Sequence, residues 1–150
     1  MATGIASRQL LLANYGNSAF RAASTLPQTA TTTYFNVVGG QVLITSIFGV
    51  ITTATGATAT NLTINATNTA GATTVAIGAQ TAVTSKAAGT ILAIPTIGGT
   101  LTALAYGVQN NEFVLGPGAI QFVTDASDTG AWKWYVNYIG LDSGAYVSVA

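Results

Sequence analysis

Short runs of β-branched, aromatic and aliphatic residues follow one another from Thr29 onward, separated by turns rich in Gly, Pro, Asn and Asp. This pattern is typical of β-strands and the turns that join them. The strongest run is 131–139 (AWKWYVNYI), and the run at 41–53 contains Gly49, which predicts a bulge or bend. We expect strands over residues 31–38, 41–53, 61–65, 73–77, 89–94, 112–115, 119–124, 131–139 and 145–149, while 101–108 is ambiguous.

Alternate side chains of a strand face opposite sides of its sheet, so the sequence also predicts which residues point inward. In the strongest strand, one face carries Trp132, Trp134, Val136 and Tyr138, and we expect it to face the core. The other face includes Lys133 and should be the more hydrated one. Ile120 and Phe122 should point inward from the preceding strand.

Turn signals recur about every 8–12 residues, which suggests an antiparallel sandwich or barrel. One of them, Gly116-Pro117-Gly118, predicts a type II turn. No long helix is indicated. The predicted fold class is therefore all-β, an antiparallel, jelly-roll-like β-sandwich with an N-terminal extended arm. The domain division is an arm with short helical turns at residues 1–28 and a sandwich domain at residues 29–150.

The predicted arm is rich in Ala and Asn, with helical turns expected over 3–13 and 18–23. It lacks the polar, charge-rich composition of stable disorder, so we expect it to order on a neighbouring molecule. A chain without residues 2–27 should then still fold. The residues proposed to bind the partner are Arg8, Leu10, Leu11, Leu12, Tyr15, Phe20 and Arg21.

Charge is scarce and unevenly distributed. Charged residues make up 5% of the 150 residues and hydrophobic residues 49%, against about 25% charged in an ordinary soluble domain. Residues 1–111 hold three basic and no acidic residues (+3), while residues 112–150 hold four acidic residues and one Lys (−3). Neutral polar side chains, or another protein, must therefore cover much of the surface.

The absence of Cys and His excludes several kinds of chemistry. Disulfides, thiolate nucleophiles and Ser-His-Asp triads are impossible, and zinc, haem and iron–sulfur centres lose their usual ligands. We therefore expect no enzymatic activity and no cofactor. Four basic residues in the whole chain also argue against a groove that tracks nucleic acid phosphates.

No membrane partner is expected either. Residues 87–108 are long enough to span a bilayer as a helix, but Pro95 and Gly98-Gly99 favour a strand–turn–strand path. The apolar run Leu10-Leu11-Leu12 is too short for the core of a secretory signal.

Two local motifs invite a binding role. Asp125 and Asp128 lie three residues apart, but a Ca²⁺ site requires more oxygen ligands, and Asx turns account for both residues. Trp132 and Trp134 could stack on a sugar, although core packing explains two tryptophans on one strand face. The tryptophans and tyrosines leave a carbohydrate-binding or adhesin module as an alternative function.

Two segments resemble small structural proteins of tailed bacteriophages, most closely capsid decoration (cement) proteins. One runs from Gly116-Pro117-Gly118 through Trp134 and Tyr138 to Leu141-Asp142-Ser143-Gly144-Ala145-Tyr146-Val147. The other is 35–44 (FNVVGGQVLI). Where that family often has Pro before the Leu-Asp pair, this chain has Gly140. The similarity covers about a third of the chain, in turn-and-strand patterns.

The resemblance implies a virion structural protein located on the capsid surface. Its partners would be the major capsid protein and further copies of itself, usually in a homotrimer, with an arm that reaches across capsomers. A phage tail or fibre component is the alternative within the same class of protein.

The composition leads to a first prediction. A chain with this little charge and this much hydrophobic surface is expected to cover part of that surface by self-association. We predict a homo-oligomer, with a trimer favoured over a dimer. Sedimentation at micromolar concentration measures the oligomeric state, and a well-behaved monomer would contradict the prediction.

Overall fold

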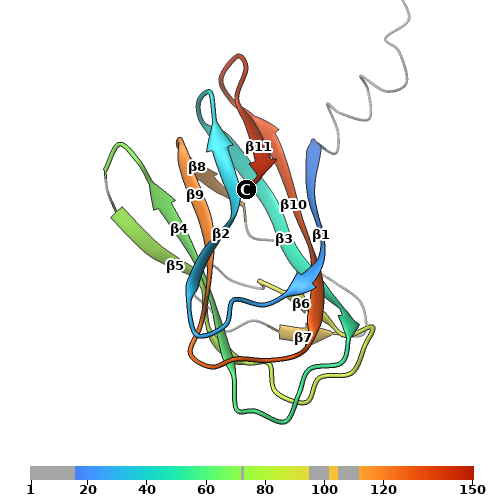
Figure 1. Cartoon of the computed structure of the whole chain (residues 1–150). Coiled ribbons are helices and arrows are strands. Elements are labelled where there is room, and N and C mark those ends of the chain that lie inside the picture. The colour runs from blue at the N-terminus through green and yellow to red at the C-terminus, as the bar shows by residue number, and fades with distance from the viewer. Residues whose placement is uncertain (1–15, 72, 95–101, 105–111) are drawn as a thin grey trace, which may run out of the picture.

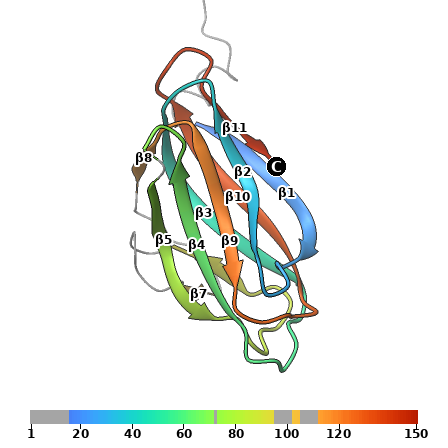
Figure 2. The same ribbon diagram turned by 60° about the vertical axis from the view of Figure 1, so that its left-hand side comes forward.

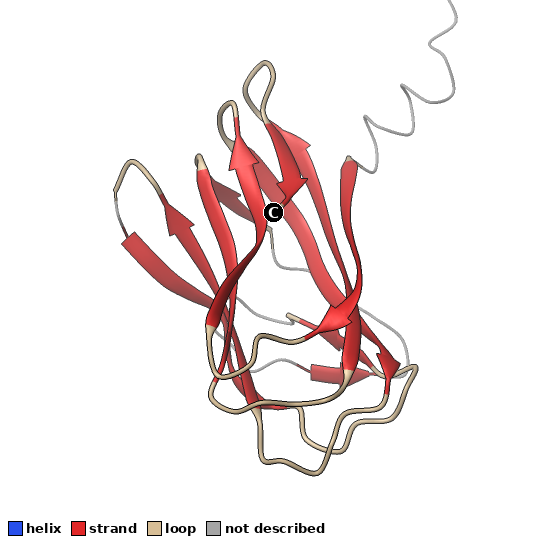
Figure 3. Ribbon diagram, viewed as in Figure 1, coloured by secondary structure: helices blue, strands red, loops and turns tan. Residues whose placement is uncertain are grey.

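Two antiparallel β-sheets make up the folded part of the chain (Figure 1). The structure is a computed structural model that describes residues 16–71, 73–94, 102–104 and 112–150. Its strands are β1 (Asn17–Thr25), β2 (Thr31–Val38), β3 (Val42–Thr53), β4 (Asn61–Asn68), β5 (Thr73–Ala82), β6 (Ile91–Ala93), β7 (Thr102–Leu104), β8 (Phe113–Leu115), β9 (Gly118–Thr124), β10 (Ala131–Gly140) and β11 (Tyr146–Val149). In the described residues all regular elements are strands (Figure 3), which confirms the all-β prediction.

The chain passes repeatedly from one sheet to the other. Sheet A has six strands in the order β1-β10-β3-β6-β7, with β8 also pairing β3. Sheet B has five strands in the order β11-β2-β9-β4-β5, and Figure 2 shows β2, β9 and β4 side by side. The successive strands β1 and β2, β3 and β4, and β9 and β10 each have one member in either sheet. The two sheets therefore form a sandwich-like arrangement with one shared interior.

Aromatic side chains fill the centre of that interior. Phe122 of sheet B meets Trp134 of sheet A edge-on, with 4.5 Å between ring centroids. Trp134 stacks on Trp132 at 5.7 Å, and Tyr34 stacks on Phe122 at 4.3 Å. These side chains and Ile120 are almost completely buried. The predicted inward face of β10 and the inward positions in β9 are therefore confirmed.

Gly49 makes room for this core rather than bending the strand. It pairs with Trp134 in an unbroken part of the β3–β10 register. A Cβ atom at Gly49 would lie 2.7 Å from atoms of the Trp134 indole, too close for a carbon contact. The predicted bulge at Gly49 is therefore wrong, and the register shifts instead between Ile44 and Ser46 and between Ile51 and Thr53.

The predicted type II turn at residues 116–118 is also wrong. That turn needs a positive φ at Gly118, and Gly118 is not among the residues with positive φ. It begins β9 and lies so close to β4 that a Cβ atom would collide with the Thr67 carbonyl group. The glycine is required there by the close approach of two strands.

The predicted arm boundary at residue 28 does not agree with the structure. Residues 17–25 form β1, which pairs with β10 from Asn17↔Tyr138 to Thr25↔Ala131. The helical turn expected over residues 18–23 is therefore wrong, because pairing with β10 decides the conformation of this segment. Leu26, just beyond β1, is buried in the core. The rest of the predicted arm, residues 1–15, lies outside the described residues, as does most of 101–108.

The position of β1 changes the expected outcome of shortening the chain. Removing residues 2–15 should leave both sheets folded, because none of the strands described here is lost. Removing residues 2–27 strips β1 from β10 and takes Leu26 from the core. That loss should be comparable to the whole net stability of a domain, about 5–15 kcal/mol. Circular dichroism and thermal melting of the two variants measure this, and a cooperatively folding 2–27 deletion would show that β1 is dispensable.

Candidate interaction surface

A row of aromatic side chains crosses the outer face of sheet A. Phe20 of β1, Tyr135 of β10 and Phe48 of β3 are paired in register on neighbouring strands. Tyr135 stacks on Phe48, with 4.8 Å between ring centroids, and packs at a tilt of 34° against Phe20, with 4.9 Å between centroids. Phe20 is 48% exposed and the other two are partly exposed. Lys133 places its ammonium group 6.0 Å from the Tyr135 ring centroid.

Aliphatic side chains extend this face on both sides of the aromatic row. In one direction Ile139 and Leu43 pair across β10 and β3, and Val114 of β8 pairs with Leu43. In the other direction Val50 pairs with Ile91 of β6. Val114 is 55% exposed. Together these residues make the outer face of sheet A apolar on both sides of the row, interrupted by Lys133 and by Asn137, which donates a hydrogen bond to Ser46 at 2.7 Å.

The outer face of sheet B is more polar over β9, β4 and β5, while the pair Val38 and Tyr146 exposes apolar surface at its β2–β11 end. Thr67 of β4 shares hydroxyl hydrogen bonds with Thr74 of β5 and Gln121 of β9, each at 3.2 Å. Further polar residues on this face are Thr33, Asn36, Thr63 and Asn65. Such a face is hydrated by its own side chains, so sheet A is the face that gains more from being covered.

Arg21, proposed as part of a partner-binding arm, instead contacts other strands of its own chain. Its guanidinium Nη1 donates a hydrogen bond to the Ala150 carbonyl at 3.0 Å and lies over the Tyr34 ring, 4.1 Å from its centroid. Tyr34 in turn donates its hydroxyl to the Thr25 carbonyl at 3.1 Å. These contacts join β1 to β2 and to the end of β11. Arg21 is therefore engaged within the chain.

The other predicted arm residues divide into two groups. Phe20 lies in the aromatic row on sheet A, where a partner can reach it. Arg8, Leu10, Leu11, Leu12 and Tyr15 lie outside the described residues.

The two tryptophans do not serve as a sugar platform. Trp132 is 0% exposed and Trp134 is 1% exposed, and both indole N–H groups are buried without a hydrogen-bond partner in the described part of the chain. Stacking of a ligand on either ring is therefore excluded in this fold. The exposed aromatic row was missed by the sequence analysis, because it becomes visible only when the register of three strands is known.

The carboxylates of Asp125 and Asp128 form hydrogen bonds that connect neighbouring loops. The buried side chain of Asp128 accepts hydrogen bonds at Oδ1 from the backbone N–H groups of Gly130, at 2.7 Å, and Gly56, at 2.9 Å. The bond to Gly130 is the predicted Asx turn. Asp125 instead binds Asn61, whose side chain and backbone N–H groups both donate at 2.7 Å. These hydrogen bonds, with a further one from Gln80, hold the pKa of Asp125 below its usual value.

The two segments that carry the phage resemblance lie against each other. Asp142 Oδ2 accepts the Gln41 N–H at 2.7 Å, and the Gln41 carbonyl accepts the Leu141 N–H at 2.9 Å. Next to them β2 pairs with β11. The two segments are therefore neighbours in the fold.

The described residues contain no cluster of three or more His, Cys, Asp or Glu side chains able to hold a metal ion. In the same part of the chain, no helix is long and apolar enough to cross a membrane.

Comparison with known proteins gives no match: no family model fits this chain, and no curated protein or solved structure is significantly similar to it.

The environment of Tyr34 leads to a prediction about alkaline pH. Burial raises the pKa of Tyr34, and the nearby Arg21 charge opposes this only in part. The unfolded chain ionises its tyrosines near pH 10, so the folded state binds the proton more tightly. Stability should therefore be intact below about pH 10 and fall as the pH rises from there through the folded pKa.

Urea unfolding of the wild type and of Tyr34→Phe between pH 8 and pH 11 measures this effect. Tyr34→Phe loses the hydrogen bond to Thr25, about 0.5–1.5 kcal/mol at neutral pH, and should show a shallower alkaline decline. Tyr146→Phe, at an exposed tyrosine, is the control. Parallel alkaline curves for the wild type and Tyr34→Phe would contradict the assignment.

Proposed function

We propose that this protein is a non-enzymatic virion structural protein that binds the outside of a bacteriophage capsid and stabilises it as a decoration protein. The observation that carries the proposal is the apolar, aromatic outer face of sheet A in a chain with 5% charged residues. Contiguous exposed apolar surface is typical of protein interaction sites. The phage class itself is supported by the resemblance of residues 35–44 and 116–147.

We further propose that the two sheets form a jelly roll. The strand orders β1-β10-β3-β6 and β2-β9-β4-β5 support this, because four strands in each sheet alternate along the chain as two Greek keys do. In this description β11 extends one sheet beside β2, and β7 and β8 are additions to the other. Shell proteins of viruses use this architecture widely.

The mechanism is mechanical. Each copy places the apolar face of sheet A across a seam between capsid subunits and buries surface that a swelling shell would have to expose again. Burial contributes roughly 25 cal/mol per Å² of apolar area. A homotrimer that binds at several such sites gains further from multivalency, so that individually weak contacts hold firmly. Because few charges are available, attachment should depend little on salt.

A tail or fibre position in the particle would use the same face, and the location of the protein in purified particles distinguishes it from a capsid position.

Carbohydrate binding is kept as a second candidate because of one observation. Phe20, Tyr135 and Phe48 form a row of exposed and partly exposed rings with Lys133 beside it. The rings of Tyr135 and Phe48 cover each other's faces, but Phe20 at the end of the row is 48% exposed and offers an apolar surface on which a sugar ring can pack. A glycan array probed with the isolated protein tests this candidate, and binding that is lost on Phe20→Ser would favour it.

The docking face is tested by binding to empty capsid shells, measured by co-sedimentation. Phe20→Ser should weaken binding about tenfold or more, since burying a Phe side chain is worth about 1.5–3 kcal/mol. The matched control is Tyr146→Ser, because Tyr146 is also 48% exposed and also lies on an edge strand, but belongs to sheet B. Equal binding by the wild type and Phe20→Ser would reject the face, and a glycan ligand without shell binding would reject the function.

A further inference from the structure

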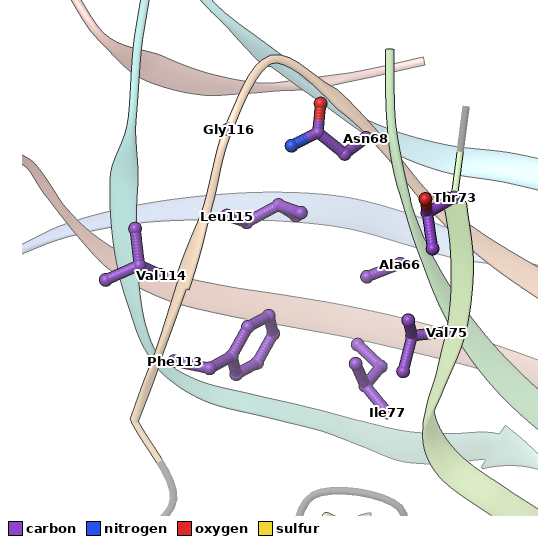
Figure 4. A pocket seen from close by; sticks show the side chains of 9 residues that line it. All are labelled: Ala66, Asn68, Thr73, Val75, Ile77, Phe113, Val114, Leu115 and Gly116. Atoms are coloured by element: carbon purple, nitrogen blue, oxygen red, sulfur yellow. The ribbon is translucent and has the colours of Figure 1, made fainter. Parts of the chain in front are cut away.

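One edge of the molecule is left open between the two sheets. A groove of about 330 Å³ lies there between β5 and β8. In Figure 4, Phe113 and Leu115 of β8 face Ala66, Val75 and Ile77 of sheet B across the groove. Its remaining lining is Asn68, Thr73, Val114 and Gly116. The groove is thus apolar along its length, with polar groups at the end marked by Asn68 and Thr73.

Among the described residues, β5 has one unpaired strand edge beside this groove. Among the described strands it pairs only with β4, so residues 73–77 have a second edge of backbone groups with no partner in the described part of the chain. Exposed edges are normally blunted by Lys or Pro, and β5 contains neither. Thr73, Val75 and Ile77 alternate along β5 and all line the groove, and Val75 is 53% exposed. The site therefore fits an extended segment with apolar residues at alternate positions.

Residues 1–15 contain such a segment. Leu10 and Leu12 are two residues apart and would share one face of a strand, while Leu11 would face away. Arg8 lies two residues before Leu10 and is the one charged residue of 1–15. The exposed Glu112 stands beside Phe113 at the end of the groove away from Asn68. An added strand that runs antiparallel to β5 would bring Arg8 to Glu112 and carry Leu10 and Leu12 along the apolar lining.

The segment cannot reach the groove of its own molecule. Gly16 lies against Tyr138 of β10 at the opposite edge of sheet A. The distance from β1 to β8, across β10 and β3, is three strand spacings, or about 14 Å in a straight line. Four residue steps lead from Gly16 to Leu12 and span at most about 13–14 Å. Leu12 would therefore reach β8 at most, with the groove still beyond it.

We propose that residues 8–12 of a second copy of this chain add to the edge of β5 and fill the groove between β5 and β8. The contact is heterologous, because the segment of one copy meets the groove of the next, and such contacts form a ring when the rotation between copies closes. The inference concerns self-assembly and does not rest on the proposed function.

The first experiment compares oligomeric states of full-length variants by sedimentation velocity. Val75→Lys puts a charge into the groove and should convert the oligomer to monomer, weakening association at least tenfold. The matched control is Val38→Lys, since Val38 is an exposed valine on β2 of the same sheet. It should remain oligomeric. Association that survives Val75→Lys, or a wild-type chain that is monomeric, overturns the proposal.

A second comparison tests the strand geometry. Replacing both Leu10 and Leu12 by Asn should abolish association, whereas Leu11→Asn should change it less than threefold. Arg8→Glu and Glu112→Arg should each weaken association, and the two together should restore part of it. Equal sensitivity at Leu11 and at the Leu10–Leu12 pair would reject an added strand.

Disulfide cross-linking tests whether the segment of one copy lies in the groove of another. The chain has no cysteine of its own, so only the introduced cysteines can react. A Leu12→Cys chain mixed with a Val75→Cys chain should give a disulfide-linked heterodimer under mild oxidation, and Leu11→Cys should give much less. A monomeric disulfide in the chain carrying both Leu12→Cys and Val75→Cys would show that the segment folds back on its own groove. If association is lost in these variants while shell binding persists, the proposed function stands without the groove contact.

Discussion

The contact between Trp134 and the side chains above and beside it determines how the two sheets can meet. The indole lies on Gly49 within sheet A, where a Cβ atom would come within 2.7 Å of its ring, and receives the edge of Phe122 from sheet B. Trp132 stacks beside it. A side chain at Gly49 would push the indole toward sheet B and change the spacing between the sheets. The alternation of the whole of β10 follows from this position, since Trp134 inward requires Tyr135 outward.

That alternation explains the chemistry of the surface. With Trp132 and Trp134 on the inner face of β10, the outward positions bring Tyr135 between Phe20 and Phe48. The middle strands of sheet B place their large residues in the interior and leave Thr, Asn and Gln outside, with Val38 and Tyr146 exposed at the β2–β11 end. A chain with so few charges therefore distinguishes its two outer faces by apolar against neutral polar side chains. The direction in which the molecule meets a partner is set by hydrophobicity rather than by charge.

Period-two patterning was sufficient to predict most strands and the inward faces of β9 and β10, because those faces depend only on the order of residues. β1 was missed because its sequence, NSAFRAAST, is rich in Ala and Ser and has weak strand propensity. Its conformation comes from pairing with β10, more than a hundred residues away in the chain. The same reason explains the errors at Gly49 and Gly118. Gly49 is required by the nearby Trp134 indole, and Gly118 by the nearby Thr67 carbonyl group. Both groups are distant in the sequence, so rules for local turns and bulges do not include them.

The two lateral edges of the molecule are treated differently, and this difference bears on assembly. At one edge Arg21 of β1 reaches Tyr34 and the Ala150 carbonyl, so the first strand of sheet A is tied to sheet B. At the other edge β5 and β8 diverge around an apolar groove. Among the described residues, the closed edge presents no apolar groove of the kind that lies between β5 and β8. The open edge instead favours a contact in which one copy donates and the next accepts, and repetition of that contact around an axis gives a cyclic oligomer.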